Sequence, residues 1–111
     1  YGCTFKASAE MKVAVIPVGY HEGFPRTASA GQSYVLISGV RSPVLGRVCM
    51  NMMMVDVSHL DKPAVADEVT LIGFSGDEFI SVSTLAGWAD TIHYEIAARL
   101  NGEIERRVID K

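Results

Sequence analysis

The sequence lacks the features of membrane-spanning, exported and nucleic-acid-binding proteins. No apolar run approaches the ~18 residues that a membrane helix needs, and the longest one, residues 13–20, contains Pro17 and Gly19. The N-terminus has no basic stretch followed by an apolar run, so no signal peptide is predicted. The net charge of −3 argues against nucleic-acid binding, which requires clustered Lys and Arg.

Cysteine is scarce as well. The two cysteines, Cys3 and Cys49, lack the spacing of a zinc site or of a disulfide framework, so we predict no metal. Two thiols, five methionines and no export signal together favour the reducing cytoplasm. The chain has 111 residues, of which 49% are hydrophobic and 21% charged, which predicts one globular domain over residues 1–111.

Short β-branched and apolar runs, separated by turn residues, dominate the first two thirds of the chain. They predict strands over residues 12–18, 32–38, 44–50, 52–57, 68–72 and 78–82, with a turn at 38–43. The last two strands are joined by residues 73–77, a short glycine-containing link that suits a hairpin. Because no helical pattern lies between these runs, they favour a small barrel or sandwich over a βαβ fold. We predict an all-β fold, a small barrel-like domain of the Greek-key type.

The last third changes character and predicts a short helical segment. Ser83 is expected to cap a helix over residues 84–89, and Asp90 or Thr91 a second one that ends near Leu100. In this second helix Ile92, Ile96 and Leu100 are expected to share one face. Glu95 and Arg99 are expected to form an i,i+4 ion pair, and Gly102 to end the helix. Residues 103–109 are predicted to form a final strand.

Three segments could carry chemistry. Residues 19–26 read G-Y-H-E-G-F-P-R and can present a tyrosine and a guanidinium at the mouth of a barrel. The spacing alone favours an ordinary turn after a strand, with one exposed tyrosine. Residues 46–52 read G-R-V-C-M-N-M, and their pattern alone favours a buried strand that uses methionine as filler. The functional alternative is that Arg47 and the backbone of Met50 and Asn51 face a site.

The third segment, residues 90–96, reads D-T-I-H-Y-E-I and places Tyr94 in the first turn of a helix. Backbone N–H groups are free there, so a nearby tyrosyl hydroxyl can help to hold an anion. Taken alone, the pattern favours a tyrosine that packs on the core.

Together and in this order, the segments resemble one family. The chain resembles the C-terminal domain of bacterial alanine racemases over essentially all of its residues. The motifs that carry the resemblance are the initial Tyr-Gly, V-A-V-I-P-V-G-Y-x-x-G-x-P-R, G-R-V-C-M-N, V-T-L-I-G, T-I-x-Y-E-I and R-R-V. The resemblance implies use of pyridoxal 5'-phosphate, bound to a lysine of an N-terminal (β/α)8 barrel, and a head-to-tail homodimer. That barrel is missing here, so we expect the chain to be a piece of a longer protein.

The resemblance also implies roles for particular residues. Tyr1 matches the tyrosine that removes the α-proton of the L-enantiomer in the partner subunit's site, and Met50 matches the residue whose backbone N–H binds the substrate carboxylate. Tyr94 matches a tyrosine that hydrogen-bonds the cofactor phosphate. The residues that match the corridor to the site are Tyr20, Arg26, Arg47 and Ile92.

The sequence departs from the family pattern at two places. Asn51 stands where Asp is usual, and residues 20–23 read Y-H-E-G where Y-A-D-G is common. Two alternatives therefore stay open beside alanine racemisation, namely a racemase of another amino acid such as serine, and a non-catalytic module for dimerisation or interaction.

Overall fold

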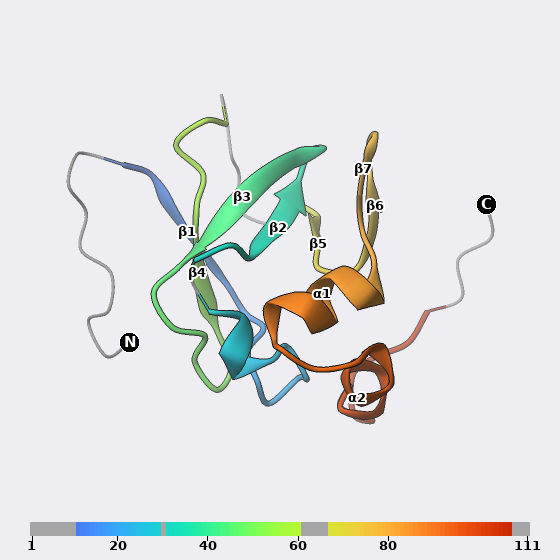
Figure 1. Ribbon diagram of the computed structural model, residues 1–111. Coiled ribbons are helices and arrows are strands. Elements are labelled where there is room, and N and C mark those ends of the chain that lie inside the picture. Colours follow the sequence, from blue (N-terminus) through green and yellow to red (C-terminus); the bar gives the residue numbers. More distant parts are fainter. Residues whose placement is uncertain (1–10, 30, 61–66, 108–111) are drawn as a thin grey trace.

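The computed structural model describes residues 11–29, 31–60 and 67–107, and its main element is an antiparallel sheet of five strands (Figure 1). The strands are β1 (Val13–Ile16), β2 (Tyr34–Ile37), β3 (Val40–Leu45), β4 (Met53–Asp56) and β5 (Val69–Thr70). Their spatial order, β1-β4-β3-β2-β5, places the first strand beside the fourth, as in a Greek key. The sheet curls into half a barrel, so the predicted all-β, barrel-like fold class is confirmed.

The other elements are short and close one side of this sheet. A 3-10 turn, η1 (Arg26–Ala28), precedes β2, and β6 (Gly73–Ser75) pairs with β7 (Glu78–Ile80) before α1 (Val82–Trp88) and α2 (His93–Ala98). The hydrophobic core lies between sheet and helices and includes Val35, Ile37, Val44, Val55, Leu85 and Ile96. Within the described ranges, no helix is long and apolar enough to span a bilayer.

The turn predicted at residues 38–43 is much shorter, and the strand after it begins earlier. Only Ser38 and Gly39 form the turn, both with positive φ, as a two-residue hairpin loop requires. Pro43 is part of β3 although it cannot donate a hydrogen bond. Because Val44 N–H donates to Ser33 O, Pro43 occupies a position whose nitrogen faces away from β2. Residues 46–52, predicted to belong mostly to a strand, form a loop instead.

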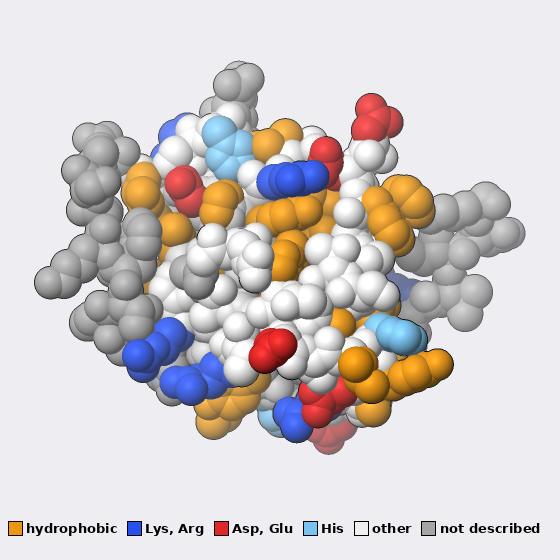
Figure 2. Space-filling model, viewed as in Figure 1, with side chains coloured by type: hydrophobic (Ala, Val, Ile, Leu, Met, Phe, Trp, Pro, Cys, Tyr) orange, Lys and Arg blue, Asp and Glu red, His pale blue; other side chains and the backbone are white. Residues whose placement is uncertain are grey.

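The predicted hairpin near the C-terminal third also has different partners. β5 pairs with β2, and the hairpin joins β6 and β7 through a two-residue turn at Gly76 and Asp77. Its exposed Phe74 and Phe79 are paired across the strands, with ring centroids 4.3 Å apart. Figure 2 shows exposed hydrophobic side chains over this hairpin and over the start of α2.

Both helices begin at residues other than the predicted ones. Ser81, not Ser83, caps α1, and its Oγ accepts a hydrogen bond from the Thr84 N–H. α2 begins after Ile92, without a side-chain cap, and ends at Ala98. The predicted ion pair is confirmed, with 3.7 Å between Arg99 Nε and Glu95 Oε2. Of the three apolar residues expected on one face only Ile96 is buried, while Ile92 and Leu100 are exposed.

The predicted final strand is wrong over its described part. Residues 103–107 adopt turn and irregular backbone, and residues 108 and 109 lie outside the described residues. The charged side chains here bond locally, because Arg106 donates to the carbonyls of Gly102 and Ile104 while Arg107 pairs with Glu105. None of the described strands pairs with residues 103–107, so no sheet hydrogen bonds extend this segment into a strand.

Ser42 offers a test of the packing of this sheet. Its side chain is fully buried on β3, and its hydroxyl has no hydrogen-bond partner among the described residues. An unpaired buried hydroxyl costs about 1–3 kcal/mol. We therefore expect Ser42→Ala to raise the free energy of unfolding by about 1 kcal/mol, measured by urea denaturation. A loss of stability would show that the hydroxyl is satisfied in solution.

Candidate functional site

The loop after β1 lies against the loop that joins β3 to β4. The N–H of Tyr20 donates to Cys49 O at 3.0 Å, and the N–H of His21 donates to Met50 O at 2.7 Å. These bonds bring together two of the three segments that the sequence singled out. The backbones approach so closely that only a residue without a side chain fits, since a Cβ on Gly19 would lie 2.2 Å from Cys49 O.

The β3–β4 loop contains a backbone N–H group without a hydrogen-bond partner among the described residues. Its ends are held by two hydrogen bonds, from Val48 N–H to Ser29 Oγ and from Cys49 N–H to Met52 O. Among the described residues the N–H of Met50 has no hydrogen-bond partner, and its side chain is 55% exposed. This N–H is therefore available to an external acceptor, whereas the buried strand that the methionine pattern favoured is absent.

Tyr94 and Ile92 line a second region, an open hollow between α1 and α2. Its volume is about 320 Å³, and Ser83, Thr91 and His93 also line it. Tyr94 is 71% exposed, and its ring packs against that of His93 with centroids 4.2 Å apart. The exposure contradicts the alternative that Tyr94 packs on the core, and it leaves the phenol accessible to a ligand.

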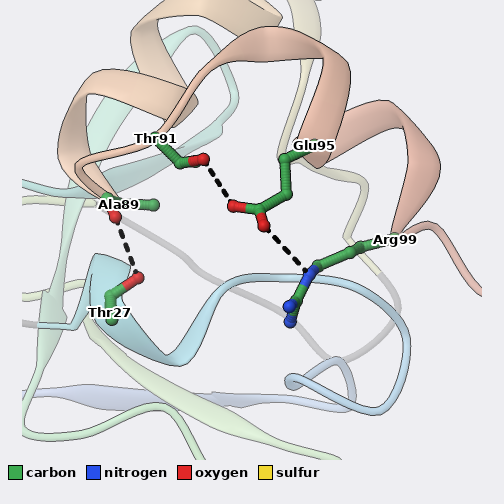
Figure 3. Close-up of polar contacts among 5 residues, drawn as sticks. All are labelled: Thr27, Ala89, Thr91, Glu95 and Arg99. Atoms are coloured by element: carbon green, nitrogen blue, oxygen red, sulfur yellow. Dashed lines mark hydrogen bonds and ion pairs between the residues drawn. The ribbon is translucent and has the colours of Figure 1, made fainter.

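Two separate groups of polar contacts lie at α2 and at the end of α1 (Figure 3). Thr91 Oγ1 bonds to the Glu95 carboxylate, whose other oxygen pairs with Arg99. Thr27 Oγ1 donates a hydrogen bond to Ala89 O at 3.2 Å and so connects η1 to the end of α1. The sequence indicated the Glu95–Arg99 pair from its spacing but gave no sign of the bond from Thr27.

The remaining predicted site residues are spread around these two regions. Tyr20 is exposed at the start of its loop, Arg26 opens η1, and Arg47 is exposed in the β3–β4 loop. Tyr1 lies outside the described residues. No cluster of three or more His, Cys, Asp or Glu residues that could hold a metal occurs in the described part of the chain.

Two shifted pKa values lie away from this site. Hydrogen bonds from the hydroxyl and N–H of Ser58 lower the pKa of Asp56. The bond from Arg41 to Glu78 raises the pKa of that arginine. Asp56 lies on β4, and Arg41 of β3 bonds to Glu78 of β7, so neither group belongs to the candidate site.

Glu22 and Asn101 are functional candidates that sequence reasoning missed. The Glu22 carboxylate accepts a hydrogen bond from the Gly19 N–H at 2.8 Å and so closes the loop on itself. The only sequence signal was the departure from Y-A-D-G at residues 20–23. Asn101 contacts the same loop from a distance of 80 residues, which no local pattern reveals.

Comparison with known proteins places this half-barrel in a known family of C-terminal domains. Residues 1–108 match the family described as alanine racemase, C-terminal domain. The alanine racemase of Deinococcus radiodurans is 49% identical over 97% of the chain and 29% of its own length. The solved alanine racemase of Streptomyces coelicolor superposes with a TM-score of 0.88 at 32% identity, over all of this chain and 28% of that one.

A third relative carries a bound group. The alanine racemase of Bartonella henselae, solved with covalently bound pyridoxal phosphate, has a TM-score of 0.77 at 32% identity, over 87% of this chain and 27% of that one.

Because the family match covers residues 1–108, the chain belongs to the alanine racemase C-terminal domain family. It spans less than a third of the length of the relatives it matches.

Proposed function

We propose that the protein of which this domain is part interconverts L- and D-alanine with pyridoxal 5'-phosphate. The observation that carries the proposal is the free N–H of Met50, held by a loop whose backbone is pressed against Gly19. A peptide N–H of this kind can bind a carboxylate and does not depend on the side chain. Family membership supplies the reaction and the N-terminal domain that completes the site.

The residues around the hollow between α1 and α2 fit a phosphate group. The hydroxyls of Tyr94 and Ser83 have no hydrogen-bond partner among the described residues, and both residues line the hollow. We assign Tyr94 to the cofactor phosphate. The cofactor, when bound, withdraws electrons from the substrate α-carbon and so makes its proton acidic. Its lysine lies in the domain that this chain lacks.

Tyr1 is assigned as the base that takes this proton from the L-enantiomer, across the interface of a head-to-tail homodimer. A phenol ordinarily loses its proton near pH ~10, so the role requires a cationic neighbour that stabilises the phenolate. Met50 N–H holds the substrate carboxylate, which keeps the α-carbon in place for the transfer. Tyr20, Arg26, Arg47 and Ile92 are assigned to the corridor. A cytoplasmic location stays a prediction.

The test is made on the full-length protein and on residues 1–111 alone. We expect the full-length protein to form D-alanine from L-alanine and to lose this activity when the cofactor is removed. The isolated domain should be inactive and form no adduct that borohydride fixes, because it lacks the lysine domain. A stoichiometric adduct on one lysine of the isolated domain would contradict the assignment. Faster turnover of L-serine would favour a racemase of another amino acid.

Asn51 provides a prediction about the carboxylate contact. The residue is exposed and follows the Met50 N–H directly. An aspartate here would place a negative charge near the substrate carboxylate, and such a pair ~4 Å apart repels by about 1 to 4 kcal/mol, depending on solvent. We expect Asn51→Asp in the full-length protein to raise KM for alanine severalfold and to change kcat less. An unchanged or lower KM would mean that Asp orients a neighbouring arginine instead.

A further inference from the structure

The loop formed by residues 19–25 is held on two sides. On one side it bonds to Cys49 and Met50, as described above. On the other side it meets the C-terminal end of α2, where a Cβ on Gly23 would lie 2.7 Å from Arg99 O. The N–H of Asn101 donates to Glu22 O at 3.2 Å, just beyond this contact. The loop thus bridges the β3–β4 loop and α2, which carry the two regions of the candidate site (Figure 1).

The side chain of Asn101 adds further hydrogen bonds to the second contact. Its Nδ2 donates to the backbone oxygen of His21 at 3.0 Å and lies 3.3 Å from His21 Nε2. Its Oδ1 accepts a hydrogen bond from the Glu103 N–H at 2.8 Å. Donor and acceptor of one half-buried amide are therefore both engaged, which fixes its orientation.

Packing fixes this loop at Phe24, which is buried in the core, but it leaves space beside the rest of the loop. A hollow of about 180 Å³ lies between the loop and the elements around it, lined on the far side by Leu71, Ile72, Leu85, Leu100 and Ile104. Side chains across such a hollow lose part of their contact energy. The hydrogen bonds from the Asn101 side chain to His21 therefore act on the part of the loop before Phe24, beside the close contact between Gly23 and Arg99.

We propose that Asn101 is a positioning residue that sets the distance between the Tyr20 loop and α2, and so the opening through which substrate reaches the site. The proposal rests on the proposed function for the meaning of that opening. Tyr20 directly precedes His21, to which the Asn101 side chain donates, and α2 carries Tyr94 in its first turn. Loss of these hydrogen bonds removes neither tyrosine but lets the loop that carries Tyr20 move relative to α2.

The experiment measures amide hydrogen exchange in a peptide covering residues 19–25 of the full-length protein. We expect about fivefold faster exchange in Asn101→Ala, the effect of losing roughly one net hydrogen bond. Asn101→Asp keeps the acceptor for Glu103 N–H but loses the donor to His21, so it should behave like Asn101→Ala. It is measured in native and His21→Ala backgrounds, because a carboxylate at this position can pair with the imidazole. Arg107→Ala, which loses only a surface ion pair, is the matched control.

Kinetics separate positioning from a merely structural role. In both Asn101 variants, KM for alanine should rise by up to about fivefold while kcat stays within about twofold, because a fraction of the loops is no longer in the competent position. Unchanged exchange in Asn101→Ala, native-like exchange in Asn101→Asp, or faster exchange with unchanged KM each overturns the proposal. A full-length protein without racemase activity would overturn the proposed function, and the exchange data alone would then decide whether Asn101 holds the loop.

Discussion

Replacing Tyr1 with phenylalanine in the full-length protein is expected to lower kcat by about 10²–10⁴-fold, the usual contribution of a positioned general base. The ring remains, so only the proton-accepting oxygen is lost. Because the proposed reaction uses one base on each face of the α-carbon, the loss should be unequal for the two enantiomers. The measurement is solvent deuterium exchange at the α-carbon, started from L-alanine and from D-alanine.

The matched control is Tyr34→Phe. Tyr34 lies on β2, where its ring packs edge-on against Trp88 with centroids 4.8 Å apart. The same loss of a hydroxyl there should leave turnover unchanged. If Tyr1→Phe gave only a small reduction, equal from both enantiomers, Tyr1 would be a packing residue and the assignment of the base would fail.

Replacing Gly19 with alanine is expected to give the largest structural effect. The added Cβ would lie 2.2 Å from Cys49 O, 2.6 Å from the Met50 carbonyl carbon and 2.7 Å from Asn51 N. All three atoms belong to the backbone, so the β3–β4 loop has to move. We expect a loss of about 3 kcal/mol in the free energy of unfolding, at the upper end of overpacking. KM for alanine should also rise, because the N–H of Met50 moves with the loop.

Gly87→Ala separates this clash from the general effect of a methyl group. Gly87 lies within α1, and a Cβ built on it meets nothing within 4 Å. Alanine should raise the free energy of unfolding there by up to about 1 kcal/mol, since it has the higher helix propensity. Thermal unfolding of the two variants gives the comparison. A Gly19→Ala protein as stable as the native one would show that the two loops are separated in solution.

Local sequence patterns predicted the elements whose formation depends on neighbours in the chain. The β-branched and apolar runs at β1, β2 and β4 indicated strands, and the Glu95–Arg99 spacing indicated the ion pair on α2. The short helical segment was likewise predicted, because a capping serine and a helical period are both local signals. The helix capped by Ser81 instead of Ser83 shows the limit, since either serine satisfies the same pattern.

The partners across the fold could not be read from the sequence. β5 pairs with β2 rather than within the predicted hairpin, since the choice depends on which sheet edge is open. The exposure of Met50 has the same kind of cause. Its loop is fixed by backbone contacts with Gly19 and His21, which lie far from it in the sequence.

The sequence by itself determined the fold class from its short strands and turn residues, and its motif order determined which family it resembles. The site residues that the resemblance implies stay predictions. Only the tertiary structure decided how the segments meet. It placed the Met50 loop against Tyr20 and His21, and it placed Asn101 on the opposite side of the same loop. Hydrogen bonds between residues 80 positions apart leave no periodic signal, because their geometry exists only after the half-barrel has closed around its core.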